Sequence, residues 1–303
     1  IMGKWKFGFF TVFIIALAFG GYVYTQLRTI DIEKLSDDLH VLRGLGGNTA
    51  VLRTDAGSVI VDTMTTGTQG KRIRKIAKEL TGMDNILLIN THYHLDHTHG
   101  NPAFKQGTRV LSTERTLSYL ERVDGEFWAD DAAAALLPNE TFSDQRTLTI
   151  GGKTIELIHP GSGHTDGDLV VVFKDERVIH MGDLFFNQHY PNIDLEAGGT
   201  VQEWPTTLDN VLALDFDRAI PGHGDTSNRA GVKQYQGFIS QLAALARTAL
   251  VENIPKEQFV TTAGLTKDAG YEPIKFVVPI GLDREFVLTR AWEEVHKDFT
   301  PID

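Results

Sequence analysis

The feature that most constrains this chain is a stretch of six residues that holds four potential metal ligands, His92, His94, Asp96 and His97. The run before it, Asn85–Ile89, is short and mostly apolar, which predicts a buried strand. The four side chains therefore lie where a strand meets a loop, a common place for a functional site on an α/β scaffold. Imidazole and carboxylate groups bind divalent transition metals, so this segment could supply ligands to two adjacent metal positions. The alternative is a histidine-rich surface tract with no geometric role.

Three segments further along the chain each place one such side chain on a glycine-rich turn. They contain His164, Asp183 and His223. Glycine lets the backbone turn sharply and brings neighbouring side chains close to a common centre. An ordinary turn could account for any one of these segments. The occurrence of three such segments after successive predicted strands is poorly explained by chance. Each follows a predicted strand, and the three strands are Thr154–Ile158, Arg177–His180 and Arg218–Ile220.

The length allows one large α/β domain or two small ones, and the composition is ordinary for a globular protein. The chain has 303 residues, of which 42% are hydrophobic and 23% charged. Short strands alternate with amphipathic helices, such as the one predicted over Gly67–Thr81, which indicates a layered α/β domain spanning residues 39–303. Residues 28–38 are polar and are predicted to be a linker. The net charge of −11 argues against a nucleic-acid partner, and the absence of cysteine excludes disulfides and thiolate ligands.

The first 27 residues differ from the rest of the chain. Lys4 and Lys6 precede an uncharged run of eighteen residues, Phe7–Tyr24. A positive flank followed by an apolar stretch predicts either a cleaved signal peptide or an N-terminal membrane anchor. The small-residue pattern at Ala16–Ala18 favours cleavage, whereas the length of the run is about the minimum for a membrane span. Both interpretations predict a periplasmic or secreted protein, in the second case anchored to the inner membrane through residues 7–24.

Taken together, the motifs H-x-H-x-D-H, G-H-T-x-G, G-D and P-G-H-G resemble those of the metallo-β-lactamase-fold hydrolases over residues 39–250. The resemblance implies an αβ/βα four-layer sandwich, with two mixed sheets inside and helices outside. It also implies two metal ions, zinc by preference, with iron and manganese as alternatives. The implied ligands of the first metal are His92, His94 and His164, and those of the second are Asp96, His97 and His223.

The same resemblance gives roles to further residues. Asp183 would bridge the two metals together with a hydroxide that attacks the substrate, and Asp96 would also accept a proton. Asp62 would order the loop that carries the histidines, and Thr165 would support the loop that carries His164. These roles make Asp96 and Asp183 the expected catalytic residues.

The loop after Asp183 is expected to border the active site, so His189 and Tyr190 are candidate substrate contacts. Surface exposure without a role in binding is the alternative interpretation for both. The C-terminal stretch Leu265–Val278 carries no motif and is expected to cover one side of the site or to contact a partner.

The substrate is expected to be a small molecule. The fold does not identify it, because members of one superfamily share a fold and differ in substrate. An aspartate rather than a cysteine in the bridging position matches the thioesterase, lactonase and nuclease branches. The loop Tyr190–Gly199 instead resembles exported β-lactamase-like members. The resulting hypothesis is a di-zinc hydrolase of a cyclic amide or ester, most similar to a β-lactamase. A thioesterase of the glyoxalase II type and a lactonase are alternatives, and a non-catalytic binding protein is the alternative from a different class. The oligomeric state is not predicted.

Overall fold

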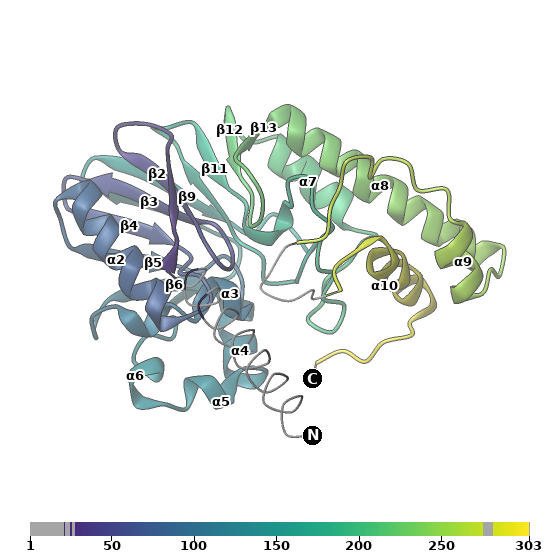
Figure 1. Ribbon diagram of the computed structural model, residues 1–303, viewed down its shortest axis with the longest axis horizontal. Helices are drawn as coiled ribbons and strands as arrows, with labels where there is room; N and C mark the ends of the chain where they lie inside the picture. The colour runs from purple at the N-terminus through teal and green to yellow at the C-terminus, as the bar shows by residue number, and fades with distance from the viewer. Residues whose placement is uncertain (1–20, 22–24, 26–27, 275–280, 303) are drawn as a thin grey trace, which may run out of the picture.

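The computed structural model describes residues 21, 25, 28–274 and 281–302. Two mixed β-sheets pack face to face, and helices cover the outer face of each (Figure 1). The order of layers is therefore helix, sheet, sheet, helix, which confirms the predicted αβ/βα sandwich.

The first sheet follows the sequence, with its seven strands in the order β1 to β7. Strands β1 to β4 form an antiparallel meander, and β4 to β7 are parallel. Because parallel strands end at the same edge of a sheet, the segments after β4 and β5 lie close together. The strands are β1 (Asp31–Lys34), β2 (Leu39–Arg43), β3 (Thr49–Thr54), β4 (Gly57–Val61), β5 (Asn85–Ile89), β6 (Arg109–Thr113) and β7 (Glu140–Phe142).

The second sheet has six strands in the order β13-β12-β11-β10-β9-β8. All its neighbours are antiparallel except β11 and β12, which pair in parallel. Because β11 and β12 are parallel, the segments that follow them lie at the same edge of the second sheet. This edge lies next to the ends of β4 and β5 in the first sheet. The strands are β8 (Gln145–Ile150), β9 (Lys153–Ile158), β10 (Val170–Phe173), β11 (Val178–His180), β12 (Arg218–Ile220) and β13 (Ser227–Asn228).

Three apolar clusters fill the spaces between the layers. Helix α2 (Gly67–Thr81) buries Ile73 and Ile76 against the outer face of the first sheet. The two sheets meet through side chains such as Leu87 and Val171. Helices α7 (Trp204–Leu212), α8 (Arg229–Val251) and α10 (Arg284–His296) cover the second sheet. The shorter helices are α3 (Leu95–Thr98), η1 (Asn101–Ala103), α4 (Glu114–Arg122), α5 (Gly125–Trp128), α6 (Asp131–Ala134), η2 (Gly182–Leu184) and α9 (Lys256–Thr262).

The N-terminal region differs from expectation in one respect. Residues 28–38 were expected to form a linker, but they contain strand β1, which pairs in register with β2 from Asp31 opposite Arg43 to Lys34 opposite His40. The polar sequence of this segment did not indicate a strand, because β1 is an edge strand with mostly exposed side chains. Most of the predicted anchor or signal, residues 7–20 and 22–24, lies outside the described residues. Among the residues that are described, no helix is long and apolar enough to span a membrane.

Candidate metal centre

The seven predicted ligands lie together at one edge of the two sheets, because each follows a strand that ends there. His92 and His94 follow β5, and the short helix α3 directly after them carries Asp96 and His97. The remaining three lie on the second sheet, and the strands that precede them in sequence are β9 for His164, β11 for Asp183 and β12 for His223.

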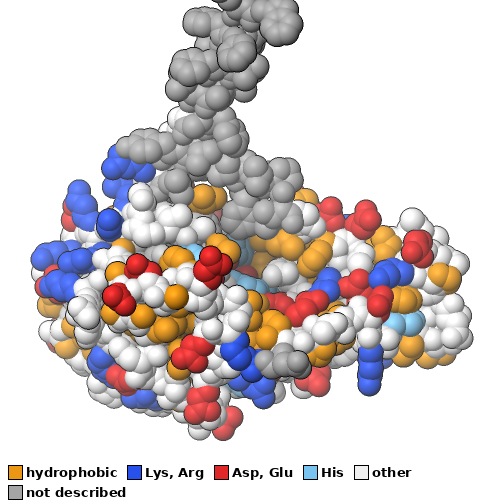
Figure 2. Space-filling model, turned by 90° about the horizontal axis from the view of Figure 1, so that it is seen from below, with side chains coloured by type: hydrophobic (Ala, Val, Ile, Leu, Met, Phe, Trp, Pro, Cys, Tyr) orange, Lys and Arg blue, Asp and Glu red, His pale blue; other side chains and the backbone are white. Residues whose placement is uncertain are grey.

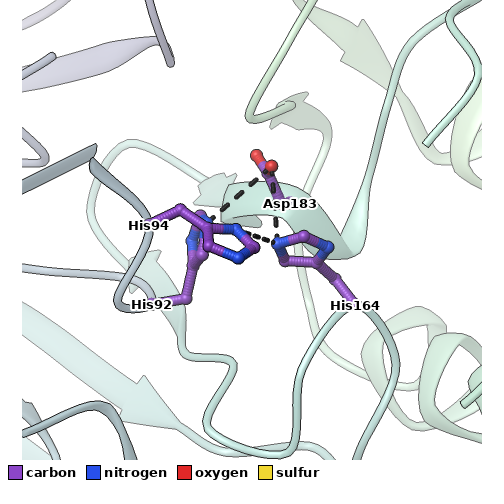
Figure 3. Close-up of side chains that lie close together, drawn as sticks. All are labelled: His92, His94, His164 and Asp183. Carbon is purple, nitrogen blue, oxygen red and sulfur yellow. Dashed lines mark hydrogen bonds and ion pairs between the residues drawn. The ribbon is translucent and has the colours of Figure 1, made fainter. Parts of the chain in front are cut away.

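Four of these side chains form a first group, His92, His94, His164 and Asp183 (Figure 3). Nδ1 of His94 lies 2.8 Å from Nε2 of His164. Oδ2 of Asp183 lies 3.6 Å from Nε2 of His164 and 3.8 Å from Nε2 of His92. All four ligand atoms lie within 4.8 Å of one another, and their side chains point toward a common centre.

The other three side chains, Asp96, His97 and His223, form a second group beside the first. Oδ2 of Asp96 lies 3.2 Å from Nε2 of His223 and 3.6 Å from Nε2 of His97. Oδ1 of Asp183 faces the same two nitrogens, at 3.1 Å from Nε2 of His97 and 3.5 Å from Nε2 of His223. The two oxygens of Asp183 therefore face different groups.

These distances fit metal coordination. Two nitrogen or oxygen ligands at about 2.0–2.1 Å from a tetrahedral zinc lie ~3.3 Å apart, close to the separations observed here. Nε2 of His92, Nε2 of His97 and Oδ1 of Asp183 are buried and make no hydrogen bond within the described part of the chain. Buried polar atoms that make no hydrogen bond are unfavourable, so a cation between them would remove that cost.

Charge within the site differs between the two groups. Burial lowers the pKa of His92 well below its usual value and that of His164 to about 4, so both rings are neutral and can bind a metal. In the second group burial also disfavours charge, but the carboxylate of Asp183 outweighs it and raises the pKa of His223 to about 9. The pKa of His97 rises well above its usual value for the same reason. A divalent cation could therefore replace two protons here without changing the net charge.

The pKa values of the two carboxylates, Asp96 and Asp183, are lowered rather than raised. Burial would raise the pKa of Asp96, but His97 and His223 lower it to about 2. The pKa of Asp183 lies well below its usual value because its histidine neighbours outweigh burial. Both carboxylates are therefore ionised at neutral pH, as metal binding requires.

The two residues expected to support the loops, Asp62 and Thr165, both make hydrogen bonds within those loops. Oδ2 of Asp62 lies 2.7 Å from Nδ1 of His97 and accepts a hydrogen bond from the hydroxyl of Thr91. This directs Nε2 of His97 into the second group. The hydroxyl and backbone N–H of Thr165 donate to the two oxygens of Asp168, which closes the turn that follows His164.

Sequence reasoning missed two residues that position ligands. Nε2 of His94 lies 2.9 Å from Oδ2 of Asp194, which also accepts a hydrogen bond from the hydroxyl of Tyr93. Asn48 is buried, and its side-chain amide donates to the carbonyls of Pro221 and Gly224 on either side of His223. Asn48 follows Gly46 and Gly47, but neither Asn48 nor Asp194 lies in one of the motifs that carry the predicted ligands. The only sequence signal was a polar residue in a short loop, which is too common to single them out.

The two candidate substrate contacts have different environments. His189 lines a hollow of about 240 Å³ together with His223, so it remains a candidate. Tyr190 was also expected to contact substrate, but its ring is buried against Phe238 and its hydroxyl donates to Asp268. The prediction for Tyr190 is therefore wrong, because a tertiary contact with the C-terminal region turns the ring inward.

Comparisons with known proteins agree with this geometry. Residues 42–223 match the model of the metallo-beta-lactamase superfamily. The chain is 27% identical over 226 residues to "Metallo-beta-lactamase type 2" of Bacillus sp. (strain 170), which is 68% of this chain and 81% of that protein. It is 25% identical over 228 residues to "2,4-dinitroanisole O-demethylase subunit alpha" of Nocardioides sp. (strain JS1661), which is 74% of this chain and 67% of that protein.

A solved structure extends the likeness to most of the chain. A double mutant of the sec-alkyl sulfatase PisA1 superposes with a TM-score of 0.71 over 90% of this chain and 52% of that chain. At 14% identity this similarity concerns the fold alone. The superfamily model, in contrast, matches more than half of the sequence and includes all seven clustered side chains. The protein therefore belongs to the metallo-β-lactamase superfamily and is a metal-dependent hydrolase.

Proposed function

We propose that the protein is a di-zinc hydrolase that opens a cyclic amide or ester, with β-lactams as the first substrate class to test. The arrangement of Asp183 carries this proposal. Its two oxygens face two separate groups of ligands, each with at least two histidines. His92, His94 and His164 would hold one ion, Asp96, His97 and His223 the other, and Asp183 would contact both.

Zinc bound in this way lowers the pKa of a coordinated water and polarises a carbonyl group. The protein's own side chains then have distinct tasks. Asp96 lines a second hollow, of about 210 Å³, beside the two ligand groups and is ionised at neutral pH. Its carboxylate can therefore accept a proton and return it to the leaving group. Asp194 and Asp62 hold His94 and His97 in fixed orientations, which keeps the site preorganised.

The ligand side chains are compatible with zinc as the metal. Five imidazoles and two carboxylates surround the site, and the sequence contains no cysteine. Such nitrogen and oxygen donors suit zinc and also iron or manganese. Elemental analysis after purification without added metal distinguishes these ions.

The proposed substrate follows from the relatives and from the ligand set. One relative is named a metallo-beta-lactamase, and another an O-demethylase, so the family covers more than one leaving group. Lactone and thioester hydrolysis need the same ligands and are the alternative substrates. A non-catalytic binding protein is disfavoured because all seven ligand positions are filled by metal-binding side chains.

The test combines metal content with turnover. We expect two equivalents of zinc per chain and hydrolysis of nitrocefin that a chelator abolishes and added zinc restores. His94→Ala should remove both zinc binding at the first group and turnover, whereas His296→Ala, a histidine on helix α10, serves as the matched control. Zinc binding with hydrolysis of lactones or thioesters alone would move the substrate to those classes. Protein that binds no metal would overturn the proposal.

We also propose that the protein acts outside the cytoplasm. This rests on the uncharged run Phe7–Tyr24 and the two lysines before it. Cell fractionation should recover the protein in the periplasm or with the inner membrane. N-terminal sequencing of the recovered protein separates cleavage from anchoring, and recovery from the cytoplasm would contradict this part of the proposal.

A further inference from the structure

Two hollows meet at the ligand groups, and both include His223 and Ile274 in their walls. Their volumes are about 210 and 240 Å³, and together they fall within the range of about 300–1,000 Å³ typical of small-molecule sites. Histidine side chains lie in the central hollow of this face, next to hydrophobic side chains (Figure 2). The two hollows differ in chemistry.

The smaller one, called here the apolar hollow, has four hydrophobic side chains in its wall next to the ligand groups: Leu95, Phe186, Ile274 and Leu282. Leu95 is 50% exposed although it lies between His94 and Asp96. Phe186 is buried, and its ring stacks on that of His223 with centroids 5.3 Å apart. Four hydrophobic side chains grouped in one wall beside the ligand groups form a contiguous apolar surface, which is typical of a site for an apolar ligand.

The larger one, called here the polar hollow, is lined by Arg43, Asn48, His189 and Asp225. The guanidinium of Arg43 lies 2.5 Å from a carboxylate oxygen of Glu33 and 2.7 Å from the hydroxyl of Thr226. Its charge is therefore already balanced within the protein. A ligand that spans both hollows would place its polar end here and its apolar end beside Leu95.

Contacts outside the apolar hollow hold its wall in place. Asp268 accepts a hydrogen bond from the hydroxyl of Tyr190 at 2.9 Å and pairs with Arg284. The backbone of Glu272 bonds to Gln188 and Tyr190 at 3.0 and 3.2 Å. These contacts tie the C-terminal region, which contributes Ile274 and Leu282, to the loop after Asp183. The hollow therefore exists before any ligand arrives, which lowers the entropic cost of binding.

We propose that the apolar hollow binds the hydrocarbon arm of the substrate, so that the protein selects esters, lactones or lactams with an arm of several carbons. This inference rests on the proposed hydrolase function. The hollow also borders ligand side chains such as Asp96 and His223, so its volume of about 210 Å³ sets an upper limit of roughly seven carbon groups, at ~30 Å³ each, on the length of the arm. Each methylene removed from water should improve binding about fourfold until the hollow is full.

Esters of increasing acyl length test this on the zinc-loaded full chain. We expect kcat/KM for p-nitrophenyl esters to rise about fourfold per methylene from acetate onward and to level off at an arm of no more than roughly seven carbons. Leu282→Ser should reduce the gain to less than twofold per methylene, because it replaces part of the apolar wall with a hydroxyl. Leu250→Ser, an exposed leucine on helix α8, is the matched control and should keep the full gain.

Calorimetry separates this inference from the hydrolase proposal. Linear carboxylates from acetate to octanoate, titrated into the zinc-loaded protein, should show Kd falling about fourfold per methylene. If this trend appears although nitrocefin, esters, lactones and thioesters are not hydrolysed, the hollow stands as assigned and the proposed substrate classes are wrong. If esters are hydrolysed but rate and Kd do not depend on chain length, the assignment of the hollow is overturned. Identical chain-length dependence in Leu282→Ser and Leu250→Ser would overturn it as well.

Discussion

Nε2 of His94 lies 2.9 Å from a carboxylate oxygen of Asp194, a residue one hundred positions further along the chain. The same oxygen accepts a hydrogen bond from the hydroxyl of Tyr93, the residue directly before His94. Asp194 therefore fixes the orientation of the ring, so that Nδ1 of His94 points toward His164 in the first group. Carboxylates that bond to the outer nitrogen of a ligating histidine strengthen metal binding in many proteins.

Replacement of this carboxylate should weaken the first metal position. Asp194→Asn removes the charge that orients His94, and we expect zinc affinity at the first group to fall by about 10- to 100-fold. Competition with a chromophoric chelator measures this change. Asp215→Asn, an exposed aspartate paired with Arg177, should leave the affinity unchanged. Equal affinities for the two variants would mean that Asp194 does not position His94.

A methyl group at Gly222 should disturb the shared carboxylate. A Cβ atom there would lie 1.9 Å from Oδ1 of Asp183, far inside van der Waals contact. Asp183 or the loop that carries His223 must then move, so Gly222→Ala should lose at least one zinc and nearly all activity. Gly237→Ala is the control, because a Cβ on this glycine of helix α8 would meet no atom within 4 Å. That control should bind two zinc ions and gain up to about 1 kcal/mol in stability. A Gly222→Ala protein with full metal content would contradict the close approach.

Removal of the Asn48 amide should loosen the loop that carries His223. The amide donates to the carbonyls of Pro221 and Gly224, at 2.9 and 2.8 Å. Asn48→Ala leaves both carbonyls without this donor, and we expect a loss of about 2 kcal/mol in unfolding free energy together with weaker binding at the second metal position. Urea unfolding and metal titration measure the two effects. Asn210→Ala removes a comparable hydrogen bond at an exposed site, to the carbonyl of Pro160. It should change the unfolding free energy and the metal affinity little.

The stability of the metal-free protein should fall as pH rises from about 6.5 to 9. The pKa of His223 in the folded protein is about 9, above the usual 6.5, and that of His97 is raised as well. A raised pKa in the folded state means that the protonated histidine stabilises the fold; for His223 this contribution is complete below pH 6.5 and is lost as pH passes 9. His92 and His164 have lowered pKa values and affect stability only below pH 6.5.

Urea unfolding of chelator-treated protein at several pH values tests this dependence. His223→Gln should flatten the fall between pH 6.5 and 9, because it removes the ring whose pKa in the folded protein is about 9. Zinc-loaded protein should not show the fall, since metal-bound histidines carry no proton to lose. A metal-free protein whose stability is constant across this range would disprove the ion pairs described for the second group.

Local sequence was sufficient for much of the fold and for the clustered ligands. Strand β5, strand β12 and helix α2 have the predicted bounds, because a short apolar run indicates a buried strand and the spacing of apolar residues along a helix records which face is buried. The ligands follow the same logic. Each lies directly after a strand, so residue type and spacing were enough to predict that His92, Asp183 and His223 would meet.

Other features depend on contacts that local sequence does not record. Strand β1 reads as a polar linker, and only its pairing with β2 makes it part of the sheet. The sequence around Tyr190 suggested a contact with substrate, but in the fold its ring packs against Phe238 and its hydroxyl donates to Asp268.

The positioning of the ligands and the shape of the hollow were decided by the tertiary structure. Asp194 reaches His94 across one hundred residues, and Asn48 reaches Pro221 across 173. A hydrogen bond between residues so far apart imposes no periodicity on either segment, so no local pattern reveals it. The sequence by itself therefore determined which side chains gather at the sheet edge. Folding alone decided how those side chains are oriented and what lines the space beside them.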